Sequence, residues 1–121
     1  MARVLIVDDV RETVELISMA VSHLGHQPIG THSAQDAMDQ LQQATPDLIL
    51  MDFMMPGRDG LETLRDIRSM PQGKYVPVLF STASSDKILE ERVLAAGGNG
   101  LLRKPLGMSE LDRAIKAYVT G

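Results

Sequence analysis

Four short apolar runs, each followed closely by polar or charged residues, constrain this chain more than any other feature. Runs of this length with polar boundaries are typical of strands that are buried on both faces of a sheet. If such strands lie parallel, their carboxyl ends meet at one edge, and the polar residues that follow them gather there. The runs are 4–7, 48–51, 78–80 and 101–102, and they lead to Asp8 and Asp9, to Asp52, to Ser81 and Thr82, and through Arg103 to Lys104.

Strand-like and helix-like segments alternate along all 121 residues, which is typical of a parallel α/β sheet. The alternation predicts a (βα)5 chain forming one domain, residues 1–121, with helices on both faces of an open, doubly wound sheet. A chain that starts at the centre and winds both ways has the strand order 2-1-3-4-5. We expect strands at 4–7, 27–31, 48–51, 76–81 and 100–103, helices at 10–24, 34–41, 61–67, 86–96 and 111–118, and a loop at 53–59.

This topology predicts a metal site between the first and third strands. Asp8, Asp9 and Asp52 would meet at the switch point, where the strand order reverses. Three neighbouring carboxylates raise one another's pKa, and a divalent cation removes that repulsion. Oxygen ligands that leave room for water suit Mg²⁺.

The same edge has the groups that phosphoryl transfer requires. A carboxylate beside Mg²⁺ is a competent nucleophile towards phosphorus, and Asp52 would become an aspartyl phosphate. Mg²⁺ and Lys104 would balance the charge on the phosphoryl oxygens, and the Thr82 hydroxyl would donate a hydrogen bond. The pattern places no histidine or glutamate as a base for fast hydrolysis, so we expect the group to be held for some time.

Composition argues against several other classes of function. The formal net charge is −4 and the chain has four aromatic residues, so phosphate contacts and base stacking both lack suitable side chains, and we expect no direct binding to nucleic acid. No apolar stretch approaches the roughly 18 residues of a membrane span, and we expect a cytoplasmic protein without membrane insertion. The absence of cysteine excludes disulfides, thiolate metal sites and a cysteine nucleophile.

Taken together, these residues resemble the receiver domain of two-component response regulators, of the single-domain type found in chemotaxis regulators. The resemblance covers the whole chain, and the Asp-x-x-Met-Pro-x-x-Asp-Gly segment at 52–60 is its most specific part. It implies a flavodoxin-like receiver fold and a switch that catalyses its own phosphorylation rather than an ordinary enzyme. The matching segments are 7–9, 52–60, 81–83 and 104–105.

The resemblance also implies individual roles and partners. Asp52 would be the phosphoacceptor, with a sensor histidine kinase or a histidine phosphotransfer protein as donor. Asp8, Asp9 and the Met54 backbone carbonyl would bind Mg²⁺ together with Asp52. Thr82 would be the switch hydroxyl and Lys104 the phosphoryl-binding cation, joined to Pro105 by a cis peptide bond. The switch would act on a downstream protein or in a phosphorelay, as a monomer or weak dimer.

Three positions distinguish this chain within the resemblance. Many family members have an aromatic residue three positions before the lysine, and Leu101 is found there instead. An aromatic readout of phosphorylation is therefore absent. Met54 and Ser84, which would flank the phosphoryl group, orient an attacking water poorly, so we expect slow self-dephosphorylation.

Three other functions fit parts of the pattern. A phosphatase with an aspartyl nucleophile normally has a second Asp two residues later as its general acid, but Met54 lies there. A flavin-binding electron carrier of similar topology needs a phosphate loop rich in Ser, Thr and Gly after the first strand, whereas Asp8 and Asp9 would repel phosphate. A degenerate receiver that serves as an interaction module is the third, although every chemical position is filled.

Overall fold

The computed structural model of the protein describes residues 1–119 and contains five parallel strands with helices between them. A hairpin of two two-residue strands and one 3₁₀ turn complete the elements. In chain order they are β1 (Arg3–Val7), α1 (Arg11–His23), β2 (Gln27–Thr31), α2 (Ala34–Gln43), β3 (Leu48–Asp52), β4 (Met54–Met55), β5 (Arg58–Asp59), α3 (Gly60–Ser69), η1 (Pro71–Gly73), β6 (Val78–Thr82), α4 (Lys87–Ala95), β7 (Gly100–Arg103) and α5 (Met108–Tyr118).

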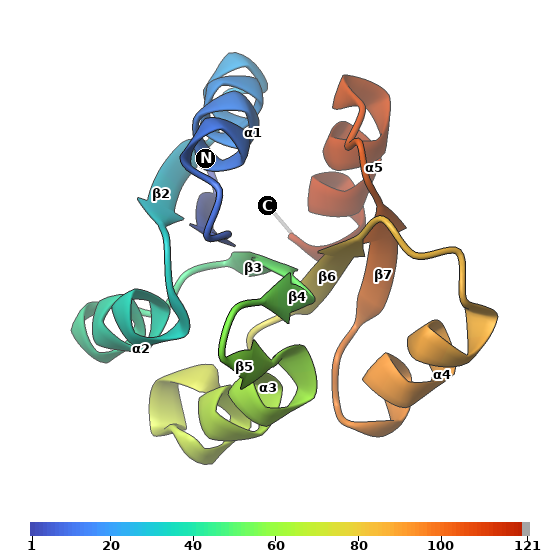
Figure 1. The fold of residues 1–121 in the computed structure, drawn as a ribbon. Coiled ribbons are helices and arrows are strands. Elements are labelled where there is room, and N and C mark those ends of the chain that lie inside the picture. Colours follow the sequence, from blue (N-terminus) through green and yellow to red (C-terminus); the bar gives the residue numbers. More distant parts are fainter. Residues whose placement is uncertain (120–121) are drawn as a thin grey trace.

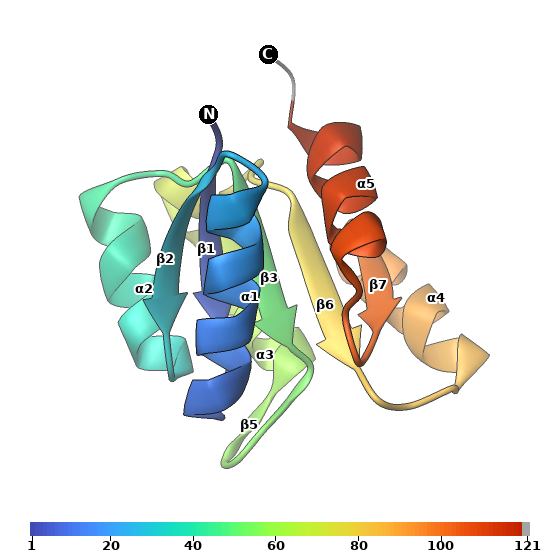
Figure 2. The same cartoon turned by 90° about the horizontal axis from the view of Figure 1, so that it is seen from above.

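The five-stranded sheet has the order β2-β1-β3-β6-β7, and all its pairings are parallel. Because β6 and β7 are the fourth and fifth long strands of the chain, the predicted order 2-1-3-4-5 is confirmed. All five strands run in the same direction in Figure 2, so their carboxyl ends form one edge, while the N-terminus lies at the other end. Helices α1 and α5 cover one face of the sheet, and α2, α3 and α4 cover the other (Figure 1).

Successive side chains of a central strand point to opposite faces of the sheet, and both faces are covered by helices, so these strands are buried on both sides. In β1, Leu5 and Val7 belong to the core beneath α2, α3 and α4, whereas Val4 and Ile6 belong to the core beneath α1 and α5. Every residue of β3 and β6 is buried. Complete burial of each large apolar side chain stabilises the fold by about 1.5–3 kcal/mol. These strands therefore hold fixed positions from which the edge residues project.

The structure differs from the sequence prediction in several places, among them the start of the last helix, which begins at Met108 rather than 111. The segment 53–59, expected to be a loop, contains the hairpin β4–β5, in which Met54 pairs with Asp59 and Met55 with Arg58. The fourth long strand lies at Val78–Thr82 rather than 76–81. The apolar pair in β7 is only half-buried, because β7 is an edge strand and has a neighbour on one side.

The amino end of the sheet is held together by Arg68, near the end of α3. Its guanidinium donates to the carbonyl oxygens of Gly73, Val76 and Gly97 and to the side-chain oxygen of Asn99, with distances of 2.6 to 3.2 Å. Asn99 Oδ1 also accepts from the Val78 N–H at 2.9 Å. One side chain thus joins α3, η1 and the starts of β6 and β7. Among residues 1–119, no helix has the length and apolar character needed to cross a membrane.

Candidate functional site

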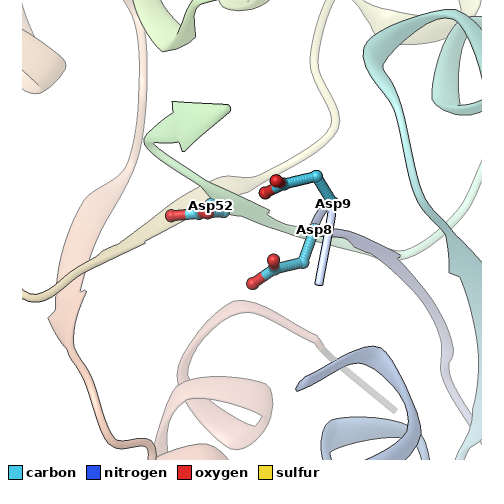
Figure 3. A group of neighbouring side chains, drawn as sticks. All are labelled: Asp8, Asp9 and Asp52. Atoms are coloured by element: carbon cyan, nitrogen blue, oxygen red, sulfur yellow. The ribbon is translucent and has the colours of Figure 1, made fainter. Parts of the chain in front are cut away.

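Three carboxylates meet where β1 and β3 end. Asp8 and Asp9 follow β1, and Asp52 is the last residue of β3. One oxygen from each lies within 4.8 Å of the others, and the three side chains lie close together in Figure 3. The sequence prediction that these carboxylates converge is confirmed.

Backbone hydrogen bonds fix two of the three acids. The Asp8 N–H donates to the Thr31 carbonyl at 3.2 Å, and Asp8 Oδ1 accepts from the Val10 N–H at 3.0 Å. Asp52 Oδ1 accepts from the Met54 N–H at 3.3 Å. Asp8 and Asp52 are buried, at 1% and 8% exposure, whereas Asp9 is exposed. The two buried acids are therefore held in place, and Asp9 faces solvent at the mouth of the site.

Lys104 is the cation of this edge. Its Nζ lies 2.9 Å from Asp8 Oδ2 and 3.4 Å from Asp52 Oδ1. Burial alone would lower the pKa of Lys104, but the hydrogen bond to Asp8 and the charges of Asp52 and Asp8 outweigh it and raise that pKa. The ammonium is therefore firmly protonated. The peptide bond from Lys104 to Pro105 is cis, as the resemblance implied.

One ammonium does not neutralise three carboxylates, and the imbalance appears at Asp52. Burial raises the pKa of Asp52 above its ordinary 3.8, and the charge of Asp8 raises it further. Lys104 and the hydrogen bond from the Met54 N–H oppose this rise only in part. Oxygen donors with excess negative charge are the ligand set that a hard divalent cation such as Mg²⁺ prefers. The residues present thus fit Mg²⁺.

A cavity of about 500 Å³ opens beside these acids, large enough for a phosphoryl group and its surrounding water. Thr82 is buried in its wall, and the Thr82 Oγ1 accepts from the Ser84 N–H at 3.1 Å. The cavity brings together four of the predicted residues, Asp52, Met54, Thr82 and Lys104, with Ser84 on its rim. Its lining is Asp52, Phe53, Met54, Thr82, Ala83, Ser84, Asp86, Leu89 and Lys104.

Sequence reasoning missed the support for the segment after Asp52. The hairpin β4–β5 contains Met54, and Arg58 ties it to α3: Arg58 Nε donates to Thr63 Oγ1 at 3.2 Å, and its guanidinium forms an ion pair with Asp66. Arg58 lies in β5 and Asp66 in α3, so no periodicity within one element links them, and the sequence gave no signal for this ion pair. The arrangement fixes the backbone next to Asp52.

Leu101 occupies the position at which many family members have an aromatic residue. Leu101 lies in β7 opposite Phe80 of β6, and it is half-buried against the core beneath α2, α3 and α4. Phe80 instead stacks edge-on against Phe53, with ring centroids 5.4 Å apart. Leu101 is thus a packing residue in this structure.

The chain is thus an open, doubly wound α/β domain with three carboxylates, a lysine and a threonine at the carboxyl edge of its sheet. Residues 4–116 match the family model of the response regulator receiver domain. The chain belongs to this family, whose members are signalling domains of two-component systems.

Similar proteins share both fold and sequence. The chain is 30% identical over 117 residues to the phosphate regulon transcriptional regulatory protein PhoB of Escherichia coli, a match that covers 97% of this chain and 51% of PhoB. It therefore spans about half the length of the curated relatives it matches. Chemotaxis protein CheY4 of Vibrio cholerae has a TM-score of 0.92 at 27% identity, covering 98% of this chain and 99% of CheY4.

A third similar structure contains a metal. The receiver domain of sensor histidine kinase PA1611 from Pseudomonas aeruginosa has a TM-score of 0.86 at 29% identity, covering 97% of this chain and 96% of that domain. Its structure has a magnesium ion coordinated in the active site cleft. Receiver domains thus bind Mg²⁺ in an acidic site, and this chain has an acidic cluster of the matching kind.

Proposed function

We propose that this protein is a phosphorylation switch in which Asp52 accepts a phosphoryl group from a histidine kinase or a histidine phosphotransfer protein. The observation that carries the proposal is the convergence of Asp8, Asp9 and Asp52 within 4.8 Å, beside a lysine and a phosphoryl-sized cavity. Residues 1–121 form one receiver domain under this proposal.

The placement of Asp52 supports this transfer. Oδ1 of Asp52 interacts with the Met54 N–H and with Lys104, which leaves Oδ2 as the attacking oxygen. A new P–O bond to Asp52 forms as the P–N bond to the donor imidazole breaks, and the imidazole leaves with the bonding electron pair. Lys104, held by Asp8, would then move its contact from Asp52 to a phosphoryl oxygen, and the Thr82 hydroxyl would donate to another.

Asp8, Asp9, Asp52 and the Met54 carbonyl would hold the metal. When bound, Mg²⁺ supplies positive charge that offsets the charge developing on the phosphoryl oxygens. The protein contribution is to hold Asp8 and Asp52 buried and hydrogen-bonded, so that little reorganisation is needed when the donor arrives. Met54 is 72% exposed and its thioether offers no group that orients an attacking water, so slow hydrolysis of the acyl phosphate is expected.

The phosphorylated domain would act by binding a downstream protein or by passing the group along a phosphorelay. A phosphatase is disfavoured by one observation. The residue two positions after Asp52 is Met54, and a thioether cannot protonate a leaving group as a second aspartate would.

The proposal is tested by incubating the protein with acetyl phosphate and Mg²⁺ and measuring its intact mass. We expect a gain of one phosphoryl group, which is lost when EDTA removes the metal and in the variants Asp52→Ala and Asp52→Asn. Asp47→Asn, which changes a carboxylate at the opposite end of β3, is the matched control and should be phosphorylated normally. An unchanged mass with acetyl phosphate and with phosphorylated histidine donors would reject the proposal.

A further inference from the structure

The loop between β6 and α4 is built from three successive hydrogen bonds between side chains and backbone. Thr82 Oγ1 accepts from the Ser84 N–H at 3.1 Å, and Ser84 Oγ accepts from the Asp86 N–H at 3.1 Å. Asp86 then caps α4 by accepting from the Ile88 N–H at 2.9 Å. Because each bond starts where the previous one ends, a displacement at Ser84 changes the surroundings of the Thr82 hydroxyl directly.

Arg103 holds this loop from outside. Its Nη1 donates to the Ser84 carbonyl at 2.8 Å, and its Nη2 lies 3.5 Å from the Ser85 carbonyl. Ser84 is thus held on both sides: its N–H by Thr82 and its carbonyl by Arg103. The guanidinium fork suits this arrangement, since two of its N–H groups can face two successive carbonyl oxygens.

The sheet register explains why Arg103 lies in reach of the loop. In the pairing of β6 with β7, Thr82 is opposite Arg103, and the Lys104 N–H donates to the Thr82 carbonyl at 2.8 Å. Two adjacent residues, Arg103 and Lys104, therefore contact opposite sides of one cavity. Lys104 contacts the acids Asp8 and Asp52, whereas Arg103 supports the loop on the rim.

From these contacts we infer that Arg103 is a positioning residue for phosphoryl binding: it fixes Ser84, and through Ser84 it fixes the Thr82 hydroxyl against the phosphoryl group. The inference rests on the proposed function and adds to it the group that holds the loop side of the cavity. It also supplies a contact between the β6–α4 loop and β7 in a chain where Leu101 replaces an aromatic residue. Mg²⁺ binding would not depend on this contact, because Asp8 and Asp52 lie on the side of the cavity that Lys104 contacts, opposite the loop.

Beryllofluoride, a tetrahedral mimic of a phosphoryl group, allows an effect on phosphoryl binding to be distinguished from an effect on Mg²⁺ binding. Affinity for Mg²⁺ and affinity for beryllofluoride in saturating Mg²⁺ are measured by titration, with ¹⁵N NMR of the Ser84 and Ser85 amides as the local readout. For Arg103→Ala we expect beryllofluoride affinity to fall by about three- to tenfold, the size of one hydrogen bond. Mg²⁺ affinity should stay within twofold (about 0.4 kcal/mol) of wild type.

Two further variants make the result specific. Arg103→Lys keeps the charge and one donor, so it should recover part of the lost affinity and part of the amide shift. Arg65→Ala removes an exposed arginine of α3 and should match wild type throughout. Unchanged or tighter beryllofluoride binding by Arg103→Ala, or an equal loss of Mg²⁺ affinity, would overturn the inference. If wild type itself fails to bind beryllofluoride with Mg²⁺, the proposed function fails and the role of Arg103 fails with it.

Discussion

The two ends of the parallel sheet are organised in opposite ways. At the amino end, Arg68 donates five hydrogen bonds to backbone and amide oxygens, so each of these acceptors has a donor. At the carboxyl end, three carboxylates face one lysine, and the pKa of Asp52 is raised by burial and by Asp8. One end therefore contributes stability, whereas the other keeps an unbalanced charge that a cation can neutralise.

Removing Arg68 gives the largest expected effect on stability. Arg68→Ala leaves the carbonyls of Gly73, Val76 and Gly97 without their donor, and we expect a loss of about 2–4 kcal/mol in the free energy of unfolding. The measurement is urea unfolding. Arg65→Ala, an exposed arginine on the same helix, should change stability by less than about 0.5 kcal/mol.

This prediction also separates stability from chemistry. Below its unfolding transition, Arg68→Ala should bind Mg²⁺ as wild type does, because within residues 1–119 the Arg68 guanidinium forms no hydrogen bond to an acid of the site. If Arg68→Ala were as stable as wild type, the Arg68 hydrogen bonds at the amino end would not contribute to stability as the account requires.

Mg²⁺ should remove the imbalance at the carboxyl end. At a free concentration of ten times its dissociation constant, a ligand that binds the folded state alone stabilises it by about 1.4 kcal/mol. We expect a gain of this order in wild type, measured by urea unfolding with and without EDTA. A similar gain in Asp52→Asn would place the bound metal elsewhere.

Without metal, Asp52→Asn should stabilise the protein by roughly 1 kcal/mol at neutral pH, because it removes one of the repelling charges. The pH dependence has a defined sign. The folded state binds the Asp52 proton more tightly than the unfolded state does, so stability should fall as pH rises from 3.8 through the raised pKa of Asp52.

A titration of unfolding free energy against pH in EDTA checks this sign, with Asp52→Asn as the reference. The fall should be smaller in the variant and should reverse in wild type when Mg²⁺ is present, since the metal binds the ionised form. A wild-type profile identical to that of the variant would mean that folding does not raise the pKa of Asp52.

The smallest effect concerns the lifetime of the phosphorylated state. An amide at position 54 can orient an attacking water, so Met54→Asn should speed decay of the acyl phosphate by roughly threefold to tenfold. Decay is followed by intact mass after removal of the donor. Met19→Asn changes a methionine of similar exposure on α1 and should decay as wild type does. A wild-type decay that is already rapid would contradict the expectation of a long-lived state.

The central part of this arrangement was predictable from the sequence. Asp8, Asp9, Asp52 and Lys104 each lie at or just after the end of a strand, and parallel strands place their carboxyl ends together, so local patterns were enough to predict their convergence. The supporting contacts were not predictable. Arg68, Arg58 and Arg103 act on partners brought close by packing and strand register, and the two-residue strands of the hairpin are too short to show a period.

The most direct test of the account identifies the residue that accepts the phosphoryl group. Borohydride reduces an acyl phosphate to an alcohol, so treatment after incubation with donor and Mg²⁺ marks the acceptor permanently, and peptide mass mapping locates it. The account predicts conversion of Asp52 to homoserine, dependent on both donor and metal, with Asp8 and Asp9 unchanged. A mark on another residue, or none on a protein that has gained phosphoryl mass, would contradict it.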